Sequence, residues 1–126
     1  MSKRKKTPAV NTAPEQPAPD YSTIAGVQRE YNRQYKQYAA ESKAWYDAHP
    51  YIPGRKRSEQ EHYDGFQIDY AGLGGLLVKA IQAEYGFSEA RAAAVYGLAY
   101  EKGHSSFGDV FCYAYDFADF VKGLPA

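Results

Sequence analysis

The stretch YSTIAGVQREYNRQYKQYAAESKAWYDA, residues 21–48, sets the architecture of this chain of 126 residues. Its apolar and aromatic residues recur at steps of three and four, the pattern of an amphipathic helix. We predict that the helix begins near Asp20 or Ser22, both good N-caps, and ends near Ala48, because two prolines and a glycine follow in HPYIPG. At 100° per residue, one stripe contains Ile24, Val27, Tyr31, Tyr35, Tyr38, Ser42 and Trp45. These tyrosines are therefore expected to face mainly the core.

Basic residues occupy the opposite side of the same predicted helix. Arg29, Arg33, Lys36 and Lys43 fall within one narrow sector, and at 1.5 Å per residue this row extends roughly 20 Å. A solvated helix face is the ordinary explanation of such a row. Two further clusters favour a surface that contacts phosphates; for the one at the N-terminus, the alternatives are a solubilising end and an anchor on an acidic partner. These clusters are Lys3, Arg4, Lys5 and Lys6 near the N-terminus, and Arg55, Lys56 and Arg57 in a basic loop at 51–58. If all three groups lie on one side of the fold, they form one positive surface.

Three more helices are predicted in the second half of the chain. The first covers about 70–85, capped by Asp69 and ended by Gly86, and the next covers about 88–102, capped by Ser88 and ended by Gly103. The last covers about 106–122. Residues 1–19 contain four prolines and almost no large apolar side chain, so we expect a disordered tail there. The predicted fold is all-α: a single helical domain at 20–126, a small bundle of about four helices, with a disordered basic N-terminal tail.

Small residues in two of these helices indicate close packing. Gly72 and Gly75 in AGLGGLL are expected to let a neighbouring helix approach. An anion-binding turn is the alternative, but no Lys, Ser or Thr follows in the arrangement that a phosphate-binding loop uses. The segment ARAAAVYGLAY is rich in Ala and Gly on every side. We therefore expect the helix at 88–102 to occupy a central position.

Charge is distributed unevenly, although the formal net charge is zero. Residues 1–57 contain eleven Lys or Arg against five Asp or Glu, a balance of +6, and residues 58–126 have a balance of −6. Zero net charge argues against nucleic-acid binding through the whole surface. The asymmetry instead predicts different partners at the two ends of the molecule.

Cysteine content and hydropathy restrict the compartment. The single cysteine, Cys112, excludes an intramolecular disulfide and a thiolate metal cluster. No apolar run follows the N-terminal charges, so we expect no secretory signal. No segment approaches the roughly 20 apolar residues that a membrane span needs. The protein is expected to be cytoplasmic, or nuclear if the host has a nucleus.

Histidines and nucleophiles offer little support for catalysis. His62 lies among Glu59, Glu61 and Asp64, but a helical metal site needs matching carboxylates on other helices, and no second Glu-x-x-His exists. His49 and His104 are predicted to be helix-end residues. No strand–turn–helix signal accompanies the possible nucleophiles Ser105, Ser106 and Cys112. We therefore predict no catalytic residue, metal site or cofactor, and a protein that is not an enzyme.

The last predicted helix carries a second informative surface. Its core side contains Phe107, Val110, Phe111, Ala114, Phe117, Ala118 and Val121. Its other side contains Asp109, Tyr113, Asp116, Asp119 and Phe120. A loop or the first helix could cover Phe120, since exposed rings waste apolar area. Alternatively, the aromatic rings and aspartates form a docking surface for a basic protein partner.

Two functions remain open from the sequence. The leading expectation is a non-enzymatic binding or regulatory protein that engages nucleic acid or a nucleoprotein complex through its basic arm and basic helix face. The alternative is a protein–protein interaction module, or an inhibitor of a partner protein, that uses the acidic–aromatic face of the last helix. Neither expectation includes a membrane, and the oligomeric state is not indicated.

Overall fold

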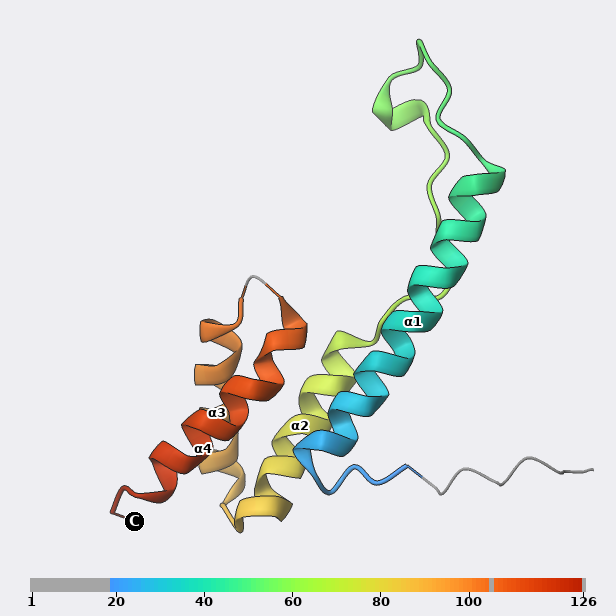
Figure 1. Cartoon of the computed structure of the whole chain (residues 1–126). Helices are drawn as coiled ribbons and strands as arrows, with labels where there is room; N and C mark the ends of the chain where they lie inside the picture. Colours follow the sequence, from blue (N-terminus) through green and yellow to red (C-terminus); the bar gives the residue numbers. More distant parts are fainter. Residues whose placement is uncertain (1–18, 105, 126) are drawn as a thin grey trace, which may run out of the picture.

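Four α-helices make up most of the part of the chain that the computed structural model describes, residues 19–104 and 106–125 (Figure 1). They are α1 (Ile24–Ala48), α2 (Tyr70–Tyr85), α3 (Glu89–Lys102) and α4 (Val110–Lys122). Short 3₁₀ turns occupy Arg57–Glu59 and Phe107–Asp109, and the described residues contain no β-strand. The prediction of a small all-α bundle is therefore confirmed. The predicted tail falls outside the described residues except for Pro19.

The helix boundaries follow from capping side chains. Asp69 accepts a hydrogen bond from the Gly72 N–H at 3.0 Å at the start of α2, and Gly86 ends that helix with φ of 72°. Ser88 accepts from the Arg91 N–H at 3.2 Å at the start of α3. These bounds agree with the sequence prediction to within one residue. The predicted start of the last helix at 106 is too early, because residues 107–109 form a 3₁₀ turn before α4 begins.

The start of α1 differs from the prediction. Thr23 is the N-cap, and its hydroxyl accepts a hydrogen bond from the Gly26 N–H at 3.0 Å. Asp20 instead accepts from the Ser22 N–H at 3.0 Å, in the turn that precedes the helix. The chain passes so close to the first turn that a Cβ at Gly26 would lie 1.8 Å from the Asp20 carbonyl oxygen. Glu84 on α2 accepts the free Ile24 N–H at 2.9 Å and completes the cap.

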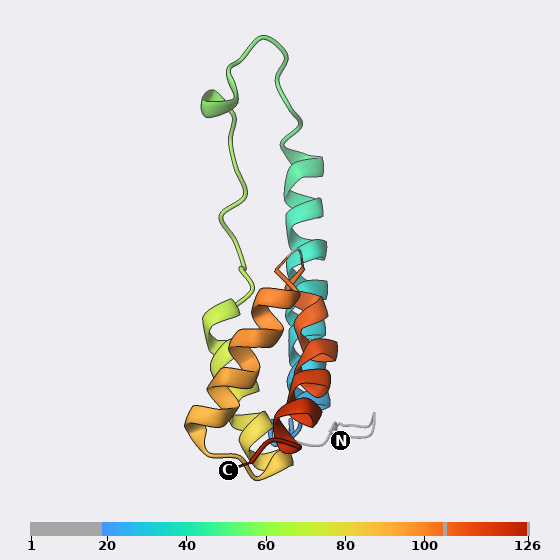
Figure 2. The ribbon, with the colours of Figure 1, turned by 90° about the vertical axis from the view of Figure 1, so that its left-hand side faces the viewer.

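One hydrophobic core joins all four helices. Helix α1 packs against α2 and α4, and α3 packs against the same two helices from the other side (Figures 1 and 2). The expectation of a central α3 is therefore wrong, because α2 and α4 separate it from α1. Phe111 of α4 is the largest fully buried side chain. The core side predicted for the last helix is confirmed at Val110, Phe111, Ala114, Ala118 and Val121, with Phe107 and Phe117 partly buried against it.

The glycine that permits close helix packing is Gly74. A Cβ there would lie 2.6 Å from the Tyr96 hydroxyl of α3, whereas Gly75 has no atom within 4 Å. Gly72 lies against the carboxylate of its own N-cap, Asp69. The prediction named Gly72 and Gly75, and it was wrong about which glycine matters. Tyr96 of α3 packs against Gly74, which lies between them in the sequence.

Helix α1 is much longer than its neighbours. It has 25 residues, against 16, 14 and 13 in the other three helices, a difference of at least about 13 Å at 1.5 Å per residue. Its buried residues are Ile24, Gly26 and Val27, all near its start. The far half extends beyond the bundle, and the following segment returns along it (Figure 2). We call residues 35–68 the projection.

The length of α1 overturns part of the predicted inner stripe. Tyr31 lies at the edge of the bundle and packs on Phe111 at a ring-centroid distance of 5.8 Å. Tyr35, one turn further, is 52% exposed. The periodicity of the tyrosines is correct, but the other helices end before they can cover Tyr35.

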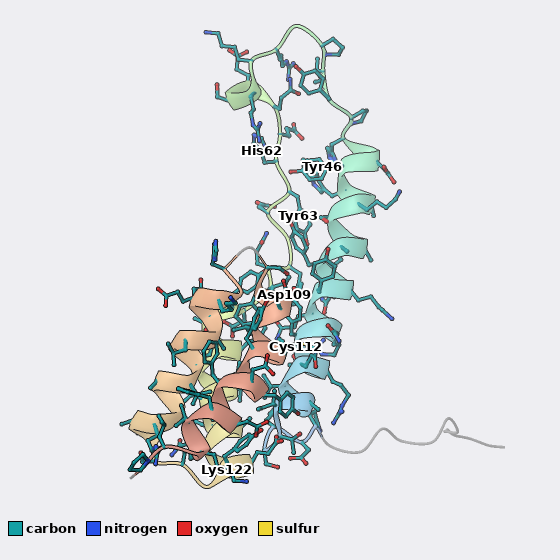
Figure 3. All side chains as sticks on the ribbon, turned by 60° about the vertical axis from the view of Figure 1, so that its left-hand side comes forward. Tyr46, His62, Tyr63, Asp109, Cys112 and Lys122 are labelled. Carbon is teal, nitrogen blue, oxygen red and sulfur yellow. The ribbon has the colours of Figure 1, made fainter. Side chains whose placement is uncertain are left out.

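Aromatic contacts fasten the returning segment to α1. The Tyr63 ring packs edge-on against Tyr38 at 5.9 Å and lies 6.5 Å from Trp45. The Tyr63 N–H donates to the Tyr46 hydroxyl at 3.3 Å. Figure 3 shows the side chains of Tyr46 and Tyr63 in the space between the helix and the returning segment. The far tyrosines and Trp45 thus stabilise the projection rather than the bundle core.

Candidate nucleic-acid interface on the projection

The predicted basic row lies on the outer side of α1. Arg29, Arg33, Lys36 and Lys43 are all exposed, and the first three line one shallow hollow together with Asn32. Lys43 lies two turns further along the helix. The row therefore begins beside the bundle and continues onto the projection.

Acids of the same helix neutralise half of this row. Arg33 forms an ion pair with Glu30 at 2.5 Å, and Lys43 pairs with Asp47 at 2.7 Å. Among the described residues, Arg29 and Lys36 form no ion pair, and no acid from the second half of the chain reaches the row. Arg29 and Lys36 therefore remain the freest cations of this face.

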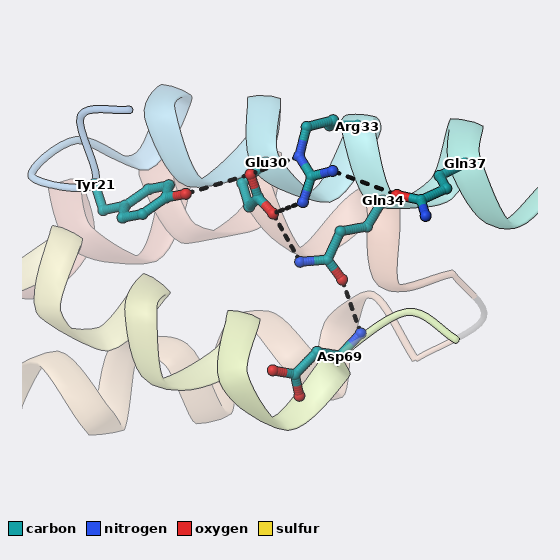
Figure 4. Close-up of polar contacts among 6 residues, drawn as sticks. All are labelled: Tyr21, Glu30, Arg33, Gln34, Gln37 and Asp69. Atoms are coloured by element: carbon teal, nitrogen blue, oxygen red, sulfur yellow. Dashed lines mark hydrogen bonds and ion pairs between the residues drawn. The ribbon is translucent and has the colours of Figure 1, made fainter. Parts of the chain in front are cut away.

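Glu30 is the centre of a polar network on α1 (Figure 4). Its carboxylate accepts hydrogen bonds from Arg33 Nε at 3.0 Å, Gln34 Nε2 at 2.8 Å and the Tyr21 hydroxyl at 3.3 Å. The Arg33 hydrogen bond, followed by those of Gln34 and Tyr21, outweighs the effect of burial and lowers the pKa of Glu30 to about 2. The same contact raises the pKa of Arg33. Arg33 is thus held in place on the helix and stays charged.

The predicted basic loop forms the tip of the projection. Gln60 closes it from the returning segment by accepting the Ile52 N–H at 3.1 Å and donating to the Ile52 carbonyl at 2.9 Å and the Arg55 carbonyl at 3.3 Å. Gly54 makes the turn with φ of 87°, a left-handed conformation that favours glycine. The side chain of Gln60 therefore closes the loop with hydrogen bonds that, in a β-hairpin, would come from the backbone of the opposite strand.

Arg55, Lys56 and Arg57 are all exposed at this tip. The nearby Glu59 is occupied within the loop, where its carboxylate accepts the Lys56 N–H at 3.1 Å. Glu61 lies 3.9 Å from His49 Nε2. Within the described part of the chain none of the three cations forms an ion pair. The loop and the helix row thus belong to one extended element, with the loop at its far end (Figure 1). The third predicted group, Lys3 to Lys6, lies outside the described residues.

A hollow of about 750 Å³ lies beside the basic tip, and sequence reasoning missed it. Tyr46, His49, Tyr51, Ile52, Arg57 and His62 are among its lining residues. His49 stacks on Trp45 at 4.1 Å with an interplanar angle of 12°. The only signal in the sequence was the aromatic and apolar pair in YIPG, directly before the basic run.

Each of the three histidines contacts a backbone carbonyl. His49 Nδ1 lies 2.9 Å from the Trp45 carbonyl, His62 Nε2 lies 3.3 Å from that of Arg57, and His104 Nδ1 lies 3.0 Å from that of Glu101. All three side chains are exposed. Residues 19–104 and 106–125 contain no group of three His, Cys, Asp or Glu placed to hold a metal ion.

The acidic–aromatic face of α4 is only partly assembled. Phe120 is 62% exposed, so no described loop or helix covers it, and Asp116 and Asp119 are exposed beside it. Tyr113 is half-buried against the core. Asp109 lies at the opposite end of α4 (Figure 3). The surface available to a partner therefore consists of Phe120 with two of the three aspartates.

Comparison with protein-family models, curated proteins and solved structures finds no match for this chain. Among the described residues, no helix combines the length and the apolar character needed to cross a membrane. The fold and its surfaces define a small helical bundle with one long projection, and the tip of this projection is basic and carries exposed aromatic rings.

Proposed function

We propose that this protein binds nucleic acid, alone or within a nucleoprotein complex, through phosphate contacts made by the projection. The observation that carries the proposal is the exposure of Arg55, Lys56 and Arg57, without ion pairs among the described residues, at the end of a helix that leaves the bundle. Arg29 and Lys36, which form no ion pair with any described residue, add two cations on the outer side of that helix. Cations at such positions contact phosphates without reading bases.

The acidic half of the chain supports an orientation for this contact. Residues 69–126, which contain α2, α3 and α4, have seven Asp or Glu against four Lys or Arg, a charge balance of −3. Phosphates repel such a surface and attract the cations of α1 and the tip. The projection would therefore point toward the nucleic acid and the bundle away from it, where α3 and α4 are free to contact another protein.

Fluorescence anisotropy with labelled single-stranded and duplex oligonucleotides tests the proposal. We expect binding at low salt, with an affinity that falls steeply as salt rises. Substituting Arg55, Lys56 and Arg57 by Gln should reduce the salt slope by about 2 to 3, because each phosphate contact contributes about 0.7 to 0.9. The matched control replaces Lys79, Lys102 and Lys122, three exposed lysines of the bundle, by Gln. The proposal would be contradicted if both triple variants lost affinity equally, or if the wild-type protein did not bind at low salt.

A protein partner for α4 is the second candidate. Phe120, 62% exposed beside Asp116 and Asp119, is the observation that favours it. A basic partner would be steered by the aspartates and would bury the ring. In a cross-linked pull-down, such a partner should be lost with Phe120→Ala and retained by the tip triple variant. The reverse pattern would leave only the nucleic-acid proposal.

A further inference from the structure

We propose that the hollow at the tip takes an unstacked base of a single-stranded nucleic acid, an inference that rests on the proposed function and specifies its ligand. Tyr51, 69% exposed, and Tyr46, 47% exposed, both line this hollow together with Ile52. Three of the nine large hydrophobic side chains exposed among the described residues therefore lie within seven positions of the sequence. Such a concentration of exposed rings is typical of a binding surface.

Contacts within the protein hold two parts of the wall of the hollow in place. Gln60 holds the Ile52 backbone through both its N–H and its carbonyl. His49 is held by its stack on Trp45 and by the contact of its Nδ1 with the Trp45 carbonyl at 2.9 Å. A preformed hollow needs little ordering when a ligand binds. Its volume of about 750 Å³ also lies within the usual range for small-ligand sites.

Apart from Arg57, the polar side chains of the hollow favour a base over a phosphate. Gln60 uses its amide on the loop backbone, and His62 faces the Arg57 carbonyl. Glu61 contributes a carboxylate, which repels a phosphate group. The cations Arg55 and Lys56 lie on the same loop, adjacent to Arg57 of the hollow. A strand can thus place its phosphates on the cations and one base against the rings.

This arrangement selects single strands. Bases of a duplex are stacked on each other and cannot enter a side hollow, whereas bases of a single strand stack on exposed aromatic rings. Stacking on an aromatic ring tolerates any sequence, because every base has a π-face. We therefore expect weak sequence preference.

The test compares three labelled oligonucleotides of equal length: oligo(dT), an abasic strand with the same phosphates, and a duplex. Wild-type protein should bind oligo(dT) at least about fivefold more tightly than the abasic strand, because each stacked base adds this much or more. Tyr51→Ser should remove that advantage without changing the salt slope, and Tyr51→Phe should retain it. Tyr100→Ser, an exposed tyrosine of α3, is the matched control. The single tryptophan, Trp45, stacks on His49 and should report the occupied hollow by its fluorescence.

The outcomes separate this inference from the function on which it rests. If all three ligands bind equally and Tyr51→Ser has no effect, the base site is wrong while phosphate binding stands. If no nucleic acid binds at low salt, both are wrong. Loss of oligo(dT) preference in Tyr51→Ser, with unchanged affinity for the abasic strand, would support the base site.

Discussion

Gln34 of α1 accepts a hydrogen bond at 2.8 Å from the backbone N–H of Asp69, the N-cap of α2 (Figure 4). The same side chain donates to Glu30 at 2.8 Å. This contact marks the level at which α2 begins. The part of α1 beyond Gln34 therefore extends past the end of α2. The contact joins the base of the projection to the bundle.

Replacing Gln34 by Ala should therefore weaken the bundle and loosen the base of the projection. A hydrogen bond of this kind contributes about 0.5–1.5 kcal/mol to the free energy of unfolding. Urea denaturation measures the loss, and amide hydrogen exchange at Asp69 should become faster. Gln37→Ala is the matched control, because the hydrogen bonds of Gln37 stay within α1. A larger loss in the control than in Gln34→Ala would show that the contact between helices has no special role.

Glu30 should make stability depend on acid pH. Its folded pKa of about 2 lies below the ordinary value of 4.5, so its contribution is complete above about pH 4.5 and is lost as pH falls toward 2. Glu30→Gln should cost about 1 kcal/mol at neutral pH, since its partner Arg33 is 59% exposed and solvent screens the pair. Urea unfolding between pH 2 and 6 should show a smaller pH dependence in this variant than in the wild type.

Replacing Gly26 or Gly75 by alanine should change the stability of the protein in opposite directions. Gly26→Ala places a Cβ 1.8 Å from the Asp20 carbonyl oxygen, so the segment before α1 must move, and we expect a loss of about 1 kcal/mol or more. Gly75→Ala meets no atom within 4 Å, and the better helix propensity of alanine should add up to about 1 kcal/mol. Thermal and urea unfolding measure both changes. A stabilising Gly26→Ala would mean that residues 20–23 are not held against the helix.

Phe111 and Phe120 lie on opposite sides of α4, and truncating them to Ala should have very different effects on stability. Phe111 is 1% exposed, and truncation to Ala should cost about 3–5 kcal/mol of unfolding free energy. Phe120→Ala should change stability by less than about 0.5 kcal/mol, because the ring already faces water. Equilibrium denaturation of both variants measures the contrast. A large loss at Phe120 would indicate a structural role for the ring and would weaken the argument for a partner at this surface.

Local chemistry explains most of what sequence reasoning predicted correctly. The positions of α2 and α3 follow from Asp69, Gly86 and Ser88, because caps and stop signals act within a few residues and do not depend on distant contacts. The core side of α4 followed from its periodicity for the same reason. The start of α1 was missed because Thr23 competes with two other good caps, and Glu84, 60 residues away, favours it.

Sequence alone determined that the described part of this chain forms four helices, which side of the first and last of them is apolar, and that the cations are concentrated in the first half. Tertiary structure decided how far each apolar side is covered, because coverage depends on the lengths and positions of neighbouring helices. For that reason Tyr35 is exposed, Tyr63 rather than the bundle packs on Tyr38, and Gln60 brings the rings of the tip beside Arg57. Periodicity is a property of one segment, whereas a projection and a hollow exist only between segments.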